Sequence, residues 1–264
     1  MNFGIKDKVA IVTGSTAGIG FASAVGLARE GAQVVINGRQ TERVEAAIAR
    51  LKELVPDAKA RGVVADLGGA QGIETLIAQV PDADILVNNL GIFEPKAFED
   101  IGDDEWLRFF EVNVLSGIRL SRHHLPRMKE RGWGRIIFVS SESAVNIPTE
   151  MIHYGLTKTA QLAVARGLAE TTTGTGVTVN SVLPGPTASE GVETFVGQLA
   201  KEKGLSQQEM EHEFFEHARP SSLLKRFIEP EEIANMIVYI SSKASAATNG
   251  AALRVEGGLL RSIL

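Results

Sequence analysis

The sequence contains no cysteine. Disulfide bonds, thiolate metal sites and cysteine nucleophiles are therefore excluded, and a reducing compartment fits this composition. Positive charge is not in excess either, because 27 lysines and arginines stand against 32 aspartates and glutamates, for a formal net charge of −5. We therefore expect neither a nucleic acid nor an anionic membrane as the main partner of this chain.

Long apolar runs are also missing. No stretch approaches the roughly 20 consecutive apolar residues that span a bilayer. Residues 1–15 show neither the apolar segment nor the A-x-A site of a secretory signal peptide. We therefore expect a cytoplasmic protein. Of the 264 residues, 44% are hydrophobic, which is enough for a large core in one domain.

Short β-branched runs alternate with helix-length segments along the whole chain. Continuous apolar strands separated by helices are typical of a parallel sheet that is covered on both faces. Right-handed crossovers then give a doubly wound α/β sheet. No linker or internal repeat divides the chain, so we predict one domain over residues 1–264. Its seven strands are predicted at 9–14, 32–38, 60–67, 83–91, 134–141, 176–185 and 250–258.

Residues 188–225 interrupt this alternation. The segment is charged and helical in character, and it lies between the sixth predicted strand and a later helix. Loops at this edge of doubly wound sheets carry ligand sites, so we predict a lid over a binding site. A helix pair that only packs on the core is the alternative. The apolar points of the segment are Phe195, Leu199, Phe214 and Phe215.

A glycine-rich turn, TGSTAGIG at 13–20, follows the first predicted strand and opens the first predicted helix, at about 19–30. Glycines at positions 14, 18 and 20 let the backbone approach a pyrophosphate, and the helix N-terminus offers free N–H groups to the anion. In this context the motif predicts a bound dinucleotide. The expected contacts in the turn are Gly14, Ser15, Gly18, Ile19 and Gly20.

The second predicted strand ends in INGRQ and carries no acid. A carboxylate at this point binds the ribose 2′-hydroxyl of NAD, whereas an arginine accommodates the 2′-phosphate of NADP. Arg39 can bind that phosphate through charge-assisted hydrogen bonds, and Ser15 can add a hydroxyl. We therefore predict NADP(H) as the preferred cofactor. NAD(H) stays possible because Asn37 and Gly38 do not forbid it, and Arg39 as an ordinary solvated arginine is the alternative.

The segment HYGLTK at 153–158 places a phenol and an ammonium four residues apart. In a helix, Tyr154 and Lys158 lie on the same face. A neighbouring ammonium favours the phenolate, so we expect Lys158 to lower the pKa of Tyr154 from its ordinary value of about 10. A lowered pKa would suit Tyr154 to general acid/base catalysis near neutral pH.

Five motifs together resemble the short-chain dehydrogenase/reductase family, in content and in order. They are TGSTAGIG, NNLG (88–91), VSSES (139–143), YGLTK (154–158) and LPGPT (183–187), and the similarity runs from Lys6 to the end. The resemblance implies a Rossmann fold and an NAD(P)-dependent oxidoreductase that interconverts a carbonyl and a secondary alcohol. It also implies a homotetramer or homodimer, with the Tyr154 helix and the helix before it across a dimer interface.

The resemblance further implies roles for individual residues. Tyr154 corresponds to the general acid/base, and Lys158 to the lysine that holds the nicotinamide ribose. Ser141 corresponds to the serine that binds the substrate oxygen, and Asn113 to the asparagine that anchors a water-linked proton path. The implied cofactor contacts are Asp66 and Leu67 at the adenine, Asn89, Leu90 and Gly91 at the adenosine ribose, and Pro184, Gly185, Thr187 and Ser189 at the nicotinamide.

Other readings of the sequence stay open at this point. A dinucleotide-binding sensor without turnover is one, although it has no need of Asn113, Ser141, Tyr154 and Lys158 together. A methyltransferase is disfavoured because the acid expected at the end of the second strand is missing. The five histidines make no metal pattern, so we predict no metal site. Sugars, steroids, acyl thioesters and small ketones are all compatible as small-molecule substrates.

Overall fold

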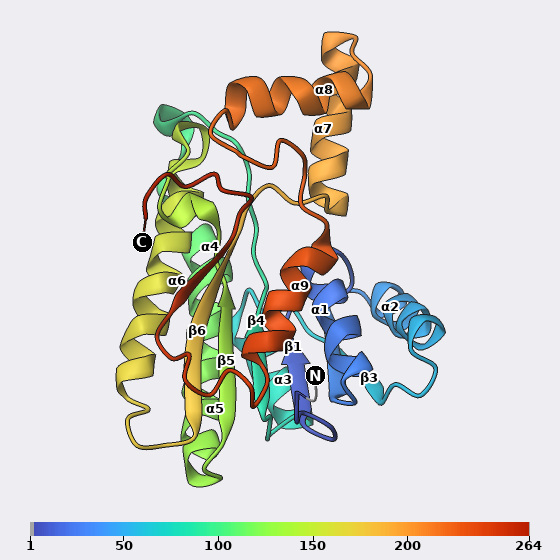
Figure 1. The fold of residues 1–264 in the computed structure, drawn as a ribbon, viewed down its shortest axis with the longest axis vertical. Coiled ribbons are helices and arrows are strands. Elements are labelled where there is room, and N and C mark those ends of the chain that lie inside the picture. Colours follow the sequence, from blue (N-terminus) through green and yellow to red (C-terminus); the bar gives the residue numbers. More distant parts are fainter. Residues whose placement is uncertain (1–2, 264) are drawn as a thin grey trace.

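The computed structural model describes residues 3–263, except for the side chains of 193–195, 198, 199 and 202; the predicted apolar points Phe195 and Leu199 thus lie outside the described side chains. Within it, seven parallel strands form one sheet in the order β3-β2-β1-β4-β5-β6-β7 (Figure 1). The predicted doubly wound α/β fold is confirmed. The strands are β1 (Val9–Val12), β2 (Gln33–Gly38), β3 (Ala60–Val64), β4 (Ile85–Asn88), β5 (Gly134–Val139), β6 (Val177–Pro184) and β7 (Ala252–Val255).

Helices connect successive strands and cover both faces of the sheet (Figure 1). They are α1 (Gly18–Arg29), α2 (Thr41–Leu54), α3 (Ala70–Gln79), α4 (Asp103–Phe110), α5 (Ser116–Glu130), α6 (Ile152–Glu170), α7 (Glu190–Lys203), α8 (Gln207–Glu213) and α9 (Pro230–Ile240). Short 3-10 turns occupy Phe98–Asp100, Glu142–Ala144 and Thr149–Met151, and π-helical turns occupy Glu111–Leu115 and Phe214–Ala218. Among residues 3–263, none of the helices combines the length and the apolar composition that crossing a bilayer requires.

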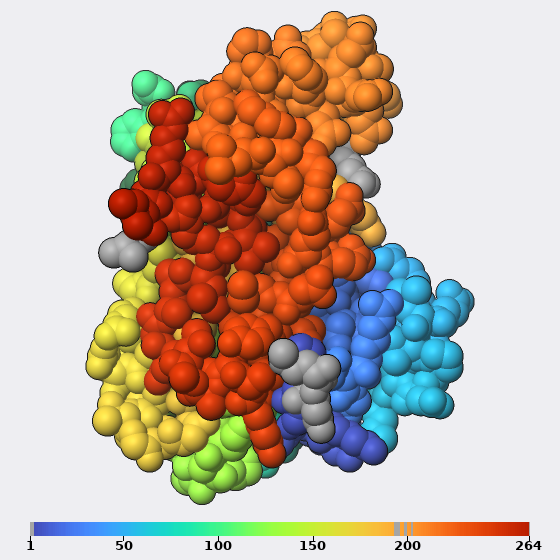
Figure 2. Space-filling view, viewed as in Figure 1, coloured from blue at the N-terminus to red at the C-terminus, as the bar shows by residue number. Residues whose placement is uncertain are grey.

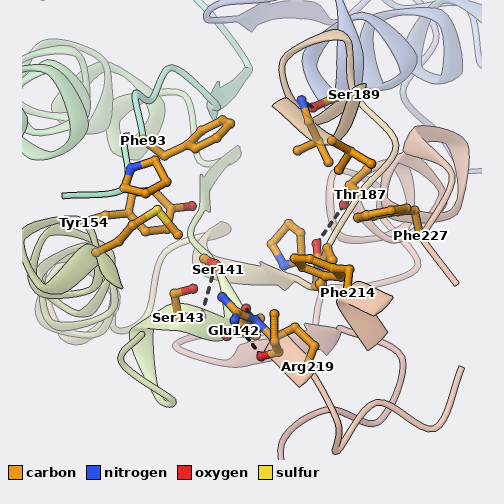
Figure 3. Close-up of a pocket in the computed structure, with 18 of the residues that line it drawn as sticks. Phe93, Ser141, Glu142, Ser143, Tyr154, Thr187, Ser189, Phe214, Arg219 and Phe227 are labelled. Carbon is orange, nitrogen blue, oxygen red and sulfur yellow. Dashed lines mark hydrogen bonds and ion pairs between the residues drawn. The ribbon is translucent and has the colours of Figure 1, made fainter. Parts of the chain in front are cut away.

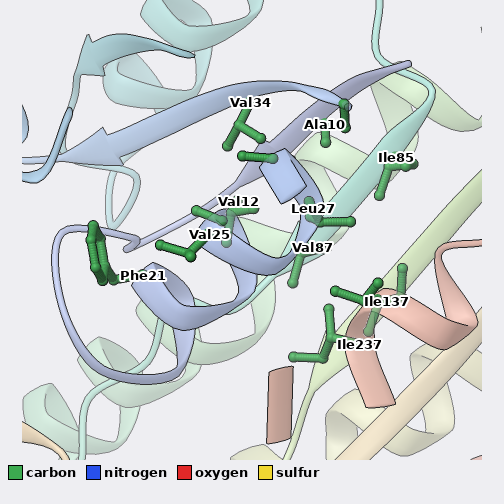
Figure 4. Close-up of a cluster of buried hydrophobic side chains, with 14 of the residues drawn as sticks. Ala10, Val12, Phe21, Val25, Leu27, Val34, Ile85, Val87, Ile137 and Ile237 are labelled. Carbon is green, nitrogen blue, oxygen red and sulfur yellow. The ribbon is translucent and has the colours of Figure 1, made fainter. Parts of the chain in front are cut away.

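The core consists of two apolar clusters, one on each face of the sheet. The first lies between the sheet and α1, α2 and α9 (Figure 4), and the second between the sheet and α3, α5 and α6. Because side chains alternate along a strand, Ala10 and Val12 belong to the first cluster and Ile11 to the second. This burial on both faces explains why the strands read as continuous apolar runs.

The strand order reverses direction between β1 and β4, and the carboxyl ends of both strands open at the same edge. In such sheets a crevice forms at the reversal, and ligands bind there. Helices α7 and α8, from the predicted insertion, lie beyond this edge at the top of Figures 1 and 2. They carry a small apolar cluster of their own, which includes Val196, Ala200 and Met210. The insertion is therefore an ordered helical layer next to the predicted ligand site.

Candidate active site

A cavity of about 600 Å³ opens at the carboxyl edge of the sheet. Its walls come from the loop after β4, the end of β5, the start of α6, the segment after β6, and the insertion. Figure 3 shows Tyr154 and Phe93 on one wall, and Thr187, Ser189 and Phe227 on the opposite wall. The predicted site residues that line it are Ile19, Asn89, Gly91, Ser141, Tyr154, Lys158, Pro184, Gly185, Thr187 and Ser189.

Tyr154 lies in the first turn of α6, with its ring edge-on to that of Phe93 at a centroid distance of 6.3 Å. Burial raises the pKa of its phenol to about 12, and a hydrogen bond with the Ser141 side chain opposes this rise. The expected lowering of the Tyr154 pKa by Lys158 is therefore wrong for the chain by itself. Desolvation disfavours the phenolate more than its neighbours favour it.

The surroundings of Lys158 explain why it does not lower the pKa of Tyr154. Its side chain is buried, and burial lowers its pKa to about 7, so the amine is only partly protonated at neutral pH. The Nζ atom donates to the carbonyl oxygen of Val139 at 3.0 Å and to Oε1 of Gln161 at 3.4 Å. It lies 5.6 Å from the centroid of the Tyr154 ring. Tyr154 and Lys158 do share a helix face, as the spacing predicts, and the buried lysine borders the cavity while its hydrogen bonds go to the interior.

The three serines after β5 have distinct surroundings. The hydroxyl of Ser140 donates to the carbonyl oxygen of Lys158 at 2.8 Å and so ties the end of β5 to α6. The Ser141 hydroxyl accepts from the backbone N–H of Ser143 at 3.1 Å, beside the cavity. The hydroxyl that also reaches Tyr154 is thus the one at position 141.

Asn113 lies behind the cavity wall, in the π-helical turn Glu111–Leu115. Its side-chain amide accepts from the N–H of Ile92 and donates to the carbonyl oxygen of Ile92 and the hydroxyl of Thr157. Its backbone carbonyl, which a π turn releases from the regular helical pattern, accepts from the side chain of Gln161. Asn113 therefore reaches Lys158 through Gln161, a residue that the sequence analysis missed although it lies three positions after Lys158.

The glycine-rich turn is held by the segment after β4. Gly14 and Gly18 adopt φ values of +58° and +54°, a left-handed conformation that favours glycine. The Thr13 hydroxyl accepts from the backbone N–H groups of Asn89 and Leu90, both at 2.9 Å, and the Asn89 amide donates back to the carbonyls of Thr13 and Gly14. A methyl group on Gly20 would come within 2.6 Å of the Gly14 carbonyl oxygen. The glycine-rich turn and the NNLG segment after β4 are thus joined by hydrogen bonds into one unit.

Ser15 is a correction to the sequence analysis. Its side chain is fully buried, and the hydroxyl donates to the carbonyl oxygen of Val12 at 2.6 Å and accepts from the N–H of Asn37 at 2.9 Å. It therefore fixes the turn from inside and does not present a hydroxyl to a 2′-phosphate.

Asn37 is also part of the framework. Its Oδ1 accepts from the N–H of Gly14, and its Nδ2 donates to the carbonyl oxygens of Val63 and Ala65. The side chain thus joins the glycine-rich turn to the end of β3. An aspartate at this position would lack the two donated hydrogen bonds.

Arg39 follows β2 and is exposed, with no hydrogen bond or ion pair to any of the described residues. Next to it, a Cβ atom on Gly38 would lie 2.6 Å from Cγ2 of Thr16 and 3.0 Å from Cγ2 of Val44. The end of β2 therefore offers a free guanidinium beside a position where only glycine fits. Thr16 was not among the predicted contacts.

The remaining predicted cofactor contacts differ in accessibility. Asp66 is exposed, and its Oδ1 accepts from the N–H of Gly68. Leu67 is buried in the core cluster beside α3 and α5, so its side chain cannot meet an adenine. Ser189 caps the N-terminus of α7, and a Cβ atom on Gly18 would lie 3.3 Å from the Ser189 Cβ. The start of the insertion is therefore next to the glycine-rich turn.

An ion pair at the floor of the cavity was not predicted as a pair. Glu142 is buried, and its Oε1 accepts from Nε of Arg219 at 3.2 Å. The same guanidinium donates through Nη1 to Oε1 of Glu150 at 3.2 Å. The sequence places both glutamates near the active-site segment, but Arg219 lies 77 positions from Glu142 and no local pattern links them.

Comparison with known proteins places the chain in a class. Residues 8–199 match the family described as short chain dehydrogenase. The chain therefore belongs to the short-chain dehydrogenase/reductase family, whose members are oxidoreductases that bind NAD(P), and the predicted resemblance is confirmed.

Among residues 3–263, no group of three or more His, Asp or Glu side chains is arranged to hold a metal ion.

Individual relatives cover the full length. An uncharacterised oxidoreductase of Bacillus subtilis, YvaG, is 51% identical over all of both chains. A D-beta-hydroxybutyrate dehydrogenase of Cupriavidus necator is 31% identical over 96% of this chain and 98% of its own. The solved structure of L-sorbose reductase from Gluconobacter frateurii, complexed with NADPH and L-sorbose, covers all of both chains with a TM-score of 0.94 and 32% identity.

Proposed function

We propose that this protein is an NADP(H)-dependent oxidoreductase that interconverts a carbonyl and a secondary alcohol, with Tyr154 as general acid/base. The observation that carries the proposal is the cavity that brings Ser141, Tyr154 and Lys158 together beside Gly185 and Thr187. A proton donor, a hydroxyl donor and an ammonium thus converge at the switch point of the sheet, where a dinucleotide binds in this fold.

The residues fit a dinucleotide. The left-handed glycines 14 and 18 leave the turn without side chains, and a Cβ atom on Gly91 would lie only 3.3 Å from Nζ of Lys158. We assign the glycine-rich turn to the pyrophosphate, Asn89 and Gly91 to a ribose, and Thr187 and Ser189 to the nicotinamide end. The bound cofactor supplies or accepts the hydride.

The side chains perform the proton chemistry. In the reduction direction, Tyr154 donates its phenolic proton to the substrate oxygen, and a raised pKa keeps that proton in place until it is needed. Ser141 donates a hydrogen bond to the same oxygen as negative charge develops there. Lys158, protonated, stabilises the resulting phenolate. Asn113 and Gln161 hold Lys158 from behind.

The proposed preference for NADP(H) rests on Arg39. Its guanidinium is exposed and has no partner among the described residues, and the end of β2 has no carboxylate to repel a 2′-phosphate. The L-sorbose reductase that resembles this chain was solved with NADPH, which supports the same choice. We also propose that residues 1–264 form a single NAD(P)-binding domain in which 188–225 acts as the lid over the substrate.

Equilibrium binding of NADPH and NADH, followed by nicotinamide fluorescence, tests the cofactor assignment. We expect NADPH to bind at least about 10-fold more tightly, which corresponds to about 1.4 kcal/mol, and Arg39→Ala to abolish this difference. Arg61→Ala is the matched control, because Arg61 lies in β3, away from the carboxyl edge, and donates to the carbonyl oxygen of Gln79.

The outcomes separate the alternatives. If NADH binds as tightly as NADPH, the preference is wrong, and an NAD(H)-dependent dehydrogenase of the same family is the better reading. If neither binds, the oxidoreductase proposal itself is overturned.

A further inference from the structure

The ion pair at the cavity floor has unused hydrogen-bonding capacity. Glu142 is 3% exposed, and its Oε2 has no hydrogen-bond partner among the described residues. Arg219 donates through Nε and Nη1 to the two glutamates, whereas its Nη2 makes no hydrogen bond within the described part of the chain. A buried polar atom without a partner is costly, and a molecule bound in the adjoining cavity can supply the missing hydrogen bond.

Apolar side chains lie next to this pair. Phe214 lies 5.8 Å from the Arg219 guanidinium, and Phe93, Met151 and Phe227 line the cavity nearby. Figure 3 shows Glu142 and Arg219 facing the same space as Ser141. Glu142 directly follows Ser141 in the chain, and its charge acts on the pKa of Tyr154. A substrate whose oxygen meets Tyr154 and Ser141 therefore lies in the same cavity as the pair.

The charge balance restricts what the pair can bind. Two carboxylates share one guanidinium, so the group carries an excess negative charge, and an anionic substrate is disfavoured. A hydroxyl both donates and accepts, and so matches a carboxylate oxygen beside a guanidinium N–H. Burial raises the pKa of Glu142, while the Arg219 guanidinium opposes that rise and favours the carboxylate.

We propose that Glu142 and Arg219 form a recognition site for a hydroxyl group next to the reacting carbonyl, so that the substrates are neutral polyhydroxylated ketones and the corresponding polyols. This inference rests on the proposed oxidoreductase function. It separates the substrate class from acyl thioesters, from plain ketones and from steroids whose carbonyl has no hydroxyl beside it. Because Arg219 belongs to the insertion, the same contact draws the lid toward the substrate.

Steady-state kinetics with NADPH test the proposal on substrates matched in chain length. We expect the wild-type protein to reduce ketohexoses with a kcat/KM at least about 10-fold above that for 2-hexanone. Glu142→Gln keeps the shape of the side chain but removes the charged acceptor. It should lower kcat/KM for the ketohexoses by about 10- to 100-fold, mainly through KM, because hydrogen bonds to charged groups are the stronger ones, and change 2-hexanone less than about 3-fold.

A second variant of the pair and a control variant complete the test. Arg219→Lys retains the charge but loses the planar fork, and should show the same selective loss for ketohexoses. Glu216→Gln is the matched control, since Glu216 is an exposed carboxylate of the same insertion that pairs with Lys225 and does not line the cavity. It should leave both substrates unchanged. Thermal unfolding and NADPH binding verify that each variant is folded.

The outcomes are distinct. A parallel loss for ketohexoses and 2-hexanone in both Glu142→Gln and Arg219→Lys would mean that the pair only holds the lid, and would overturn the proposal. A wild-type preference for 2-hexanone would overturn it as well. If the wild-type protein binds NADPH but reduces no ketone and, with NADP⁺, oxidises no secondary alcohol, the failure belongs to the proposed function.

Discussion

Burial disfavours the charged form of both Tyr154 and Lys158, and this single cause moves their pKa values in opposite directions. The spacing of the two residues could be interpreted from the sequence, because helix geometry alone places positions i and i+4 on one face. The pKa values of the two residues could not be predicted from the sequence, because desolvation depends on how completely the surrounding chain covers them. The same holds for Ser15, whose position in the motif is conspicuous but whose hydroxyl faces the interior.

Lys158 should impose a measurable pH dependence on stability. Its pKa falls from 10.5 to about 7 on folding, so between these pH values the unfolded chain binds more protons than the folded chain. The free energy of unfolding should therefore rise with pH across this window. Lys158→Met removes the titrating group, so its free energy of unfolding should rise less steeply than that of the wild type between pH 6.5 and pH 9.5, and its stability relative to the wild type should be higher at pH 6.5 than at pH 9.5. Urea unfolding at both pH values measures it, and an equal difference at both would contradict a lowered pKa.

Tyr154→Phe should separate catalysis from binding. Loss of a general acid costs about 10²- to 10⁴-fold in rate, so we expect kcat to fall by that factor while NADPH binds as before. Tyr239→Phe is the control, since Tyr239 is the other of the two tyrosines and lies in α9, outside the cavity lining. Undiminished turnover in Tyr154→Phe would exclude the proposed mechanism, and a wild type that binds NADPH without any turnover would favour the sensor alternative.

At the level of secondary-structure elements, regular segments were predictable and irregular ones were not. Helix α2 (Thr41–Leu54) shows why a regular segment is predictable, because its apolar residues recur with helical period and Gly and Pro are absent. The π turn around Asn113 has no comparable signal in the sequence, and in the structure it contacts α4, α5 and α6. The ion pair between Arg219 and Glu142 was equally unpredictable, since a contact across 77 positions depends on how the insertion folds back.

A pair of glycine substitutions tests the packing of individual helices. A Cβ atom on Gly72 in α3 would lie 1.8 Å from the backbone carbonyl oxygen of Asp66, whereas one on Gly197 in α7 would meet nothing within 4 Å. Gly72→Ala should therefore destabilise the protein by about 1–3 kcal/mol or more. Gly197→Ala should stabilise it by up to about 1 kcal/mol through helix propensity. Chemical denaturation of both variants measures the two signs, and a Gly72→Ala protein as stable as the wild type would contradict the described close approach.

For the whole molecule, the fold class followed from the alternation of strands and helices, but the quaternary structure did not. The prediction of a homodimer or homotetramer comes from family resemblance and stays a prediction. Its physical support is apolar exposure on the Tyr154 helix, α6, where Leu156 is 47% exposed. Such surface is a candidate for burial against another copy of the chain.

Leu156→Arg should disrupt such an interface. A charge placed in an apolar contact between copies costs several kcal/mol, so the variant should sediment as a smaller species than the wild type. Leu54→Arg is the control, because Leu54 is similarly exposed, at 50%, but ends α2 on a different part of the molecule. Sedimentation equilibrium measures the molar mass of both variants. A wild type that sediments as a monomer at every concentration would contradict the predicted homodimer or homotetramer.

The end of β2 has an evolutionary consequence. Under the proposed preference for NADP(H), a descendant that turned to NAD(H) would gain from a carboxylate there. An aspartate in place of Asn37 would lose the hydrogen bonds to the carbonyl oxygens of Val63 and Ala65. A side chain at position 38 requires Thr16 and Val44 to shift or to be replaced. Exchange of Arg39 meets no such obstacle. The order of mutations is therefore constrained, because an acid at position 38 is favoured only together with changes in the side chains that surround it.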